Sequence, residues 1–144
     1  SCCKYYQGTG NSDTRSSNLA DRAEQRALTR EFTLKAEAIV VAKALRVHRS
    51  TSSDDSAQFR ITKVLKGSLT VGTVVTYPLN LSEVMGCTIA SQFDSALADE
   101  GHDLLLYIRG GRLRRSSSLN RRWPEISARE EMRIVRRTLE GLDV

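Results

Sequence analysis

The sequence is poor in several residue types, and each shortage excludes a class of protein. The 144 residues include 2 prolines and 9 glycines, which excludes a collagenous chain and a proline-rich low-complexity chain. The longest apolar run, residues 38–42, is far shorter than the roughly 18 residues that a membrane-spanning helix needs. Aromatic residues make up 6% of the chain and offer few platforms for stacking nucleic-acid bases. We therefore expect a soluble globular protein, and the shortage of aromatic residues argues against a nucleic-acid partner.

Residues that carry catalysis or bind metals are also scarce. The two histidines, His48 and His102, stand apart, and no C-x-x-C pair occurs, so the usual zinc-ligand spacings are missing. His102-Asp103 has no nucleophile that its spacing nominates as a partner. Gly110-Gly111 lacks the Lys and the Ser or Thr that complete a phosphate-binding loop. We therefore predict a protein that is not an enzyme and that uses no metal and no cofactor.

Basic residues, by contrast, are abundant and unevenly placed. The chain has 22 Lys and Arg against 17 Asp and Glu, a net charge of +5, and residues 109–122 contain six arginines and no acid. Such a block attracts phosphate, anionic lipid headgroups or an acidic protein surface, although it also suits a solvated loop. The candidate binding residues in this loop are Arg109, Arg112, Arg114, Arg115, Arg121 and Arg122.

The three cysteines indicate a compartment. Cys2 and Cys3 are adjacent and lie far from Cys87, which favours one long-range disulfide and one spare thiol over three reduced cysteines. A bridge closing a loop of about 85 residues contributes on the order of 4 kcal/mol in the chain-entropy model. The chain starts without Met, so we expect a processed precursor that is secreted or periplasmic. Cys2 near the start also fits a lipid-anchored precursor.

Residues 19–35 have the pattern of an amphipathic helix. Ser17 or Asn18 can cap its first turn, and apolar residues recur at positions 20, 23, 27, 28 and 32. Alanine lines most of this apolar face, which predicts close docking of the helix on a sheet. Residues 1–18 precede it as a polar N-terminal segment.

A capping box, S-x-x-E from Ser127 to Glu130, predicts a second helix over about residues 128–140. Its apolar stripe is expected at positions 132, 135 and 139, and Gly141 stops the helix. Glu130 and Glu131 are expected to pair with arginines on the solvated face.

The remaining periodic segments predict β-strands over residues 38–47, 57–65, 71–79, 103–108 and 113–123. The apolar–polar alternation shifts phase at Val64-Leu65, which indicates a β-bulge of the kind found where a sheet coils into a barrel. Pro78 places the third strand at an edge, and residues 80–87 are expected to be irregular. Five strands and two flanking helices in one domain predict a mainly β protein with an OB-fold, a five-stranded Greek-key barrel over about residues 38–123.

Short motifs in these strands resemble those of a known superfamily. Residues 36–44, A-E-A-I-V-V-A-K-A, match the opening strand A-D-x-V-F-x-G-x-V. Residues 57–67 match F-x-V-x-x-V-x-K-G, and residues 73–77 match V-x-V. Gly86-Cys87 together with residues 101–107 match C-G…G-x-x-Y-L-V-Y. In this order and spacing, about residues 2–140 resemble the tissue-inhibitor-of-metalloproteinases and netrin-like superfamily, which includes uncharacterised bacterial members.

The resemblance implies a disulfide between Cys87 and either Cys2 or Cys3. In this superfamily an N-terminal Cys is tied to a Cys that precedes the strand corresponding here to residues 104–108. The chain departs from the family in two ways. No residue separates Cys2 from Cys3, and a second downstream Cys, expected near Leu119, is absent, so at most one of the family's bridges can form.

The resemblance also implies a function. The animal inhibitors of this superfamily chelate a protease zinc with the free amine and carbonyl of an N-terminal Cys. A metalloprotease is therefore a candidate partner and Cys2 and Cys3 are candidate binding residues, although Ser1 precedes Cys2 in this chain. We expect a non-enzymatic extracytoplasmic protein-binding module that acts through its disulfide-pinned N-terminal segment. The alternative is binding of a polyanion, such as nucleic acid, anionic lipid or a cell-wall polymer, through the arginine-rich loop.

Overall fold

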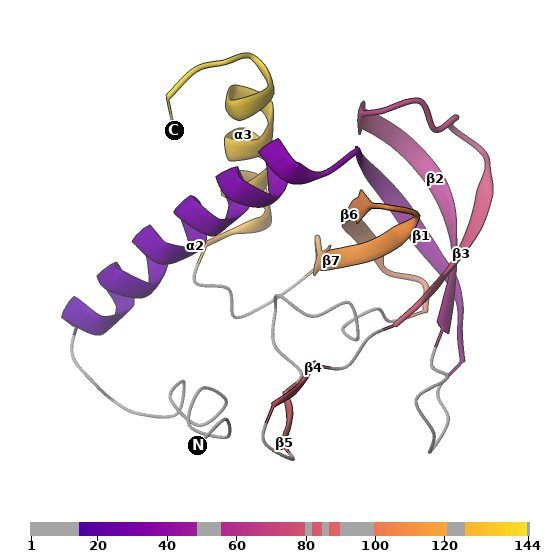
Figure 1. Cartoon of the computed structure of the whole chain (residues 1–144), viewed down its shortest axis with the longest axis horizontal. Helices are drawn as coiled ribbons and strands as arrows, with labels where there is room; N and C mark the ends of the chain where they lie inside the picture. Colours follow the sequence, from indigo (N-terminus) through magenta and orange to yellow (C-terminus); the bar gives the residue numbers. More distant parts are fainter. Residues whose placement is uncertain are drawn as a thin grey trace.

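The computed structural model describes residues 15–48, 56–79, 82–84, 87–89, 100–120 and 126–143. In this part of the chain a five-stranded antiparallel sheet has two helices packed together on one side of it, which confirms a mainly β fold with flanking helices (Figure 1). The helices are α2 (Arg15–Lys35) and α3 (Ala128–Leu139). The strands of the sheet are β1 (Ala38–His48), β2 (Ser56–Lys66), β3 (Val74–Pro78), β6 (Asp103–Arg109) and β7 (Arg112–Ser118). A separate hairpin consists of β4 (Ser82–Val84) and β5 (Cys87–Ile89).

The sheet has the strand order β3-β2-β1-β6-β7, and each neighbouring pair is antiparallel. Register shifts interrupt the long β1–β2 ladder, and one of them leaves Leu65 as an extra residue in β2. This confirms the bulge predicted at Val64-Leu65. The edge strands β3 and β7 also contact each other, so the sheet curls back on itself. Pro78 ends β3, which is an edge strand as predicted.

The central strands β1 and β6 are buried on both faces. Side chains alternate between the faces of a strand, so Val40 and Leu106 lie in the core inside the coiled sheet. Their neighbours Ile39 and Tyr107 lie on the opposite face, where they pack with Val135 of α3. A strand that is covered on both sides needs an unbroken apolar run, which is what β6 has.

The buried face of α2 differs from the predicted one. Ala23 and Ala27 are exposed, whereas Gln25, Thr29 and Thr33 are buried. The two threonine hydroxyls donate to main-chain carbonyls one turn earlier, each at 2.7 Å, so they are buried without losing hydrogen bonds. This face lies mainly against α3 rather than against the sheet. The prediction of an alanine face docked on the sheet is therefore wrong, because it counted only apolar side chains as buried.

Three further local predictions are corrected. Helix α2 begins at Arg15, so Ser17 and Asn18 lie within the helix and do not cap it. The third strand begins at Val74 because Gly72, with a φ of 92°, forms a turn before it. Residues 80–87 contain β4 and the start of β5, where irregular structure was predicted.

Both predicted ends of α3 are confirmed. The Ser127 hydroxyl accepts a hydrogen bond from the Glu130 amide at 3.0 Å. At the other end Gly141 has a φ of 76°, and the Leu142 amide donates to the Arg137 carbonyl at 2.8 Å. This is the Schellman arrangement, which satisfies carbonyls that the helix leaves without partners.

The buried stripe of α3 confirms only Val135 of the three predicted positions. Its buried residues are Glu131, Ile134, Val135 and Thr138. Leu139 is exposed and Met132 is only partly buried. The prediction that Glu131 lies on the solvated face is wrong, because its side chain is fully buried between the helix and the sheet.

The Lys66-Gly67 motif joins α2 to the sheet. Lys66 Nζ donates to the carbonyls of Thr33 at 3.0 Å and Leu34 at 3.3 Å, which belong to the last turn of α2. Gly67 has a φ of 98°, and a Cβ there would lie 2.9 Å from the Ala38 Cβ. Only glycine fits this close approach and this backbone conformation.

Candidate functional site

Residues 109–118 of the arginine-rich segment form the end of a tight β-hairpin, so the strand predicted to begin at Leu113 is confirmed in β7 and the predicted loop is reduced to a two-residue turn. Arg109 ends β6, Arg112 begins β7, and the two residues pair across Gly110-Gly111. Both glycines have positive φ, 62° and 70°, as a type I′ turn requires. Two arginines placed directly opposite each other repel, so the pairing is unfavourable for folding unless an anion lies nearby. We call residues 109–115 the basic hairpin.

A bulge in β7 decides which arginines of the hairpin reach solvent. Tyr107 pairs with Arg115 and Ile108 pairs with Leu113, so Arg114 is an extra residue. The extra residue turns Leu113 into the core of the sheet and Arg115 toward the face covered by the helices. Arg114 is exposed and Arg115 is fully buried. The prediction that Arg115 is available to a ligand in a solvated loop is therefore wrong.

The other predicted arginines divide into two groups. Arg109, Arg112 and Arg114 are exposed, and none of them forms an ion pair or a side-chain hydrogen bond with another described residue. Arg121 and Arg122 lie outside the described residues. Among the described arginines of the predicted segment, the exposed ones are therefore Arg109, Arg112 and Arg114.

A hollow of about 300 Å³ lies beside the basic hairpin. It is lined by Phe32, Lys35, Ala36, Tyr107, Arg109 and Arg114. Phe32 and Lys35 belong to the last turn of α2, and Ala36 follows it. Tyr107 and Arg109 belong to β6, and Arg114 is the bulge residue of β7. Half of the six described lining residues are cations and none of the six is an acid, while Phe32, backed by the buried ring of Tyr107, supplies an apolar wall. We call this site the basic hollow.

A buried polar network lies behind that wall. Glu131 Oε2 accepts hydrogen bonds from the Tyr107 hydroxyl at 2.6 Å and from the Ser117 hydroxyl at 2.9 Å. Arg115 Nη2 lies 3.5 Å from the same oxygen, and Arg115 Nε donates to Ser117 Oγ at 3.2 Å. All four side chains are buried. Their mutual bonds offset the cost of removing two charges from water.

Arg115 also contacts both rings of the apolar wall. Its guanidinium carbon lies 5.5 Å from the ring centroid of Phe32 and 5.4 Å from that of Tyr107. The ring centroids of Phe32 and Tyr107 are 5.9 Å apart and the rings are inclined by 58°. A cation over an aromatic face is attracted by the ring quadrupole. The buried Arg115–Glu131 pair therefore fixes the aromatic side of the basic hollow.

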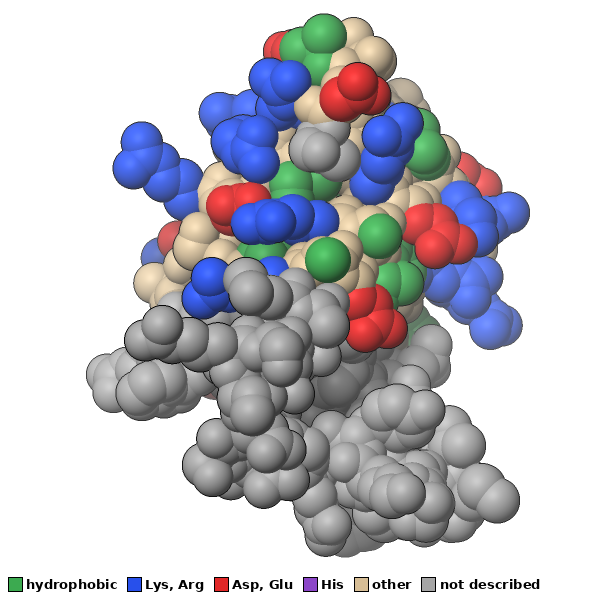
Figure 2. All heavy atoms as spheres, turned by 90° about the vertical axis from the view of Figure 1, so that its left-hand side faces the viewer, with side chains coloured by type: hydrophobic (Ala, Val, Ile, Leu, Met, Phe, Trp, Pro, Cys, Tyr) green, Lys and Arg blue, Asp and Glu red, His purple; other side chains and the backbone are tan. Residues whose placement is uncertain are grey.

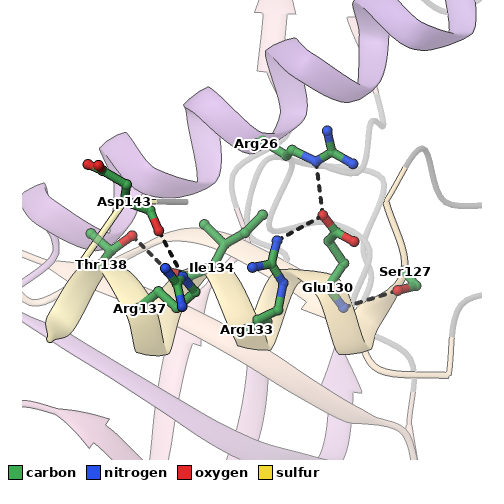
Figure 3. A network of polar contacts seen from close by, with 8 residues as sticks. All are labelled: Arg26, Ser127, Glu130, Arg133, Ile134, Arg137, Thr138 and Asp143. Atoms are coloured by element: carbon green, nitrogen blue, oxygen red, sulfur yellow. Dashed lines mark hydrogen bonds and ion pairs between the residues drawn. The ribbon is translucent and has the colours of Figure 1, made fainter. Parts of the chain in front are cut away.

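An exposed set of ion pairs links the two helices (Figure 3). Arg26 Nε of α2 and Arg133 Nη2 of α3 lie 2.9 Å and 3.3 Å from Glu130 Oε1. Partial burial alone would raise the pKa of the Glu130 carboxyl, but the hydrogen bonds from Arg133 and Arg26 and their charges lower it below its ordinary value. On the described part of the helix side, basic and acidic side chains are interspersed (Figure 2), unlike in the basic hollow.

The other predicted site residues are less informative. Cys2 and Cys3 lie outside the described residues and the Cys87 side chain is also not described, so the disulfide stays a prediction. His48 and His102 are exposed, and the described residues hold no group of three or more potential metal ligands. None of the described helices combines the length and the apolar character that crossing a membrane requires.

No family model and no curated protein matches the chain. The resemblance to the netrin-like superfamily therefore stays a prediction from short motifs.

Sequence reasoning found the arginines of the site but missed Phe32, Lys35 and the role of Glu131. One signal was present: positions 131, 134, 135 and 138 have the spacing of a buried helix face. A glutamate on such a face requires a buried partner. Nothing in the sequence alone indicated that the partner is Arg115, because a bulge decides the orientation of that arginine.

Proposed function

We propose that the chain is a non-catalytic binding module that presents the basic hairpin to an acidic surface of a partner protein. One observation carries the proposal: Arg109, Arg112 and Arg114 are exposed on a tight hairpin, and no other described residue neutralises them. The tight hairpin already orders the backbone that carries these side chains, so a partner does not have to order that backbone when it binds. The mutual repulsion of Arg109 and Arg112 would be relieved by a partner's carboxylates.

The strand order supports an OB-type barrel of the netrin-like kind. Strands β1, β2 and β3 follow one another as neighbours, and β6 returns to lie beside β1, which is the order of a Greek key. The contact between β3 and β7 supports closure of the sheet. In such a barrel the basic hairpin is a loop at one end, a common position for binding residues.

An acidic protein fits the exposed residues better than a nucleic acid does. Single-stranded nucleic acids bind by stacking bases on exposed aromatic rings as well as by charge. The described aromatic residues Phe32, Phe59, Tyr77 and Tyr107 are all buried or partly buried. Carboxylates need only the planar donors of arginine, which the hairpin supplies.

The extracytoplasmic location and the inhibitor-like role of Cys2 and Cys3 toward a metalloprotease belong to the same proposal. They rest on the cysteine pattern and the motif resemblance, and a disulfide to Cys87 would support both. Removing Ser1 would raise the potency of a metalloprotease inhibitor by freeing the Cys2 amine, and acetylating that amine would abolish it.

The experiment is a binding titration with a fluorescent poly-L-glutamate peptide. The triple variant R109Q/R112Q/R114Q removes three charges from the basic hairpin. The matched control K43Q/R46Q/R60Q removes three exposed charges at the opposite end of β1 and on β2. We expect the hairpin variant to bind about tenfold more weakly or worse, the control to stay within about twofold, and added salt to weaken binding.

Two outcomes would contradict the proposal. Equal losses in both triple variants would mean that net charge alone attracts the peptide. Binding of a single-stranded oligonucleotide or of anionic vesicles that exceeds binding of poly-L-glutamate would favour the polyanion alternative instead.

A further inference from the structure

The basic hollow has the size of a small-molecule site. Its volume of about 300 Å³ lies at the lower end of the range for ligand pockets. An apolar cavity of roughly half that volume accommodates benzene. The basic hollow therefore has room for one aromatic ring and a charged group attached to it.

The cationic side of the hollow is suited to a carboxylate or a phosphate. Lys35 is ion-paired with Glu31 at 2.6 Å, which neutralises part of its charge. Arg109 and Arg114 have no such acidic partner among the described residues. The planar donors of arginine match the paired oxygens of these anions.

The apolar side of the hollow is suited to a flat ring. Phe32 and Tyr107 lie at a tilted angle to each other, and both are held by contacts with Arg115. Tyr107 is fully buried and its hydroxyl is bonded to Glu131, so it supports Phe32 from behind, and Phe32, which is partly exposed, is the ring that a ligand can reach. An aromatic ligand would gain ring contacts with a surface that is already in place.

We propose that the basic hollow binds an aromatic acid, meaning a flat ring that carries a carboxylate or a phosphate. The ring lies against the exposed part of Phe32, and the anionic group lies between Arg109 and Arg114. This inference shares Arg109 and Arg114 with the proposed function and rests on it in that respect alone. The hollow and the hairpin tip can be tested separately.

The test is an NMR titration of the isotope-labelled protein with phenyl phosphate and benzoate. Inorganic phosphate supplies the anion without the ring, and benzyl alcohol supplies the ring without the anion. We expect saturable shifts of the Tyr107 and Arg114 amides with a dissociation constant on the order of millimolar for at least one aromatic acid. We expect binding about tenfold weaker or undetectable for each half-ligand. The preferred head group distinguishes a carboxylate ligand from a phosphate ligand.

Two charge reversals on the same hairpin separate this site from general attraction. Arg114→Glu changes a residue that lines the hollow, and Arg112→Glu changes a residue that does not. We expect R114E to abolish the saturable shifts and R112E to leave the dissociation constant within about twofold. Poly-L-glutamate binding should weaken in both variants if the proposed function holds.

Three results would overturn the inference. They are equal binding of phenyl phosphate and inorganic phosphate, equal losses in R112E and R114E, and no saturation up to about 20 mM ligand. Binding of poly-L-glutamate but of no aromatic acid by the unsubstituted protein would refute the small-molecule site alone. The converse result would refute the proposed function alone.

Discussion

The Glu131→Gln substitution removes a buried charge with almost no change in side-chain volume. The Glu131 side chain is fully buried and its Oε2 contacts Tyr107, Ser117 and Arg115 within 3.5 Å. Breaking one side of a buried ion pair costs about 3–5 kcal/mol, because the remaining charge stays out of water. Glu130→Gln makes the same change one residue earlier, where exposed ion pairs contribute about 0.2–1 kcal/mol each. We therefore expect E131Q to lower the free energy of unfolding by about 2–4 kcal/mol more than E130Q.

The assay is urea unfolding at neutral pH, followed by circular dichroism. The variants are E130Q, E131Q, R115M and R115M/E131Q, which complete a double-mutant cycle. In the R115M background the loss of the carboxylate charge should cost at least about 2 kcal/mol less, since the buried guanidinium of Arg115 is no longer left opposite it. The double variant also gives a measurement if E131Q alone is too unstable to purify. Equal destabilisation by E130Q and E131Q, or strict additivity in the cycle, would refute the buried pair.

Three further predictions concern other parts of the chain. Gly67→Ala should destabilise the protein by roughly 2 kcal/mol or more. Gly111→Ala should destabilise it less, because a Cβ at position 111 would meet no atom within 4 Å, and thermal unfolding of the two variants compares the effects. The lowered pKa of Glu130 gives a stabilisation that is complete above about pH 4.5 and is lost as the pH falls further; E130Q should flatten this part of a stability–pH curve. Non-reducing peptide mapping should find Cys87 bonded to an N-terminal cysteine; three free thiols in exported protein would exclude this.

Much of the fold could be predicted because its signals are local. Alternation in β2 and the apolar run in β6 are properties of consecutive residues, and the Val64-Leu65 bulge appears as a phase shift in that alternation. The Ser127 cap likewise depends on residues three positions apart. Each of these features is decided within one segment, so no knowledge of tertiary contacts was needed.

The failures share the opposite property, since each depends on a neighbour distant in sequence. Thr29 and Thr33 are buried although their hydropathy alone favours exposure, because they lie on a helix that packs against α3. Arg115 is buried because an extra residue in β7 turns it toward Glu131, and no local pattern announces that bulge. The basic hollow combines the end of α2 with β6 and β7, which are more than 60 residues away along the chain. Its arginines were predictable from composition, but its aromatic wall was not.

The most direct test of the proposed function is to locate the bound acidic probe on the protein. Isotope-labelled protein titrated with poly-L-glutamate at low salt should show its largest amide shifts in the basic hairpin, residues 109–115, and at the end of α2 beside the basic hollow. Shifts centred instead on Lys43, Arg46 and Arg60, or the absence of saturable shifts anywhere, would contradict the proposal that the basic hairpin is the binding surface.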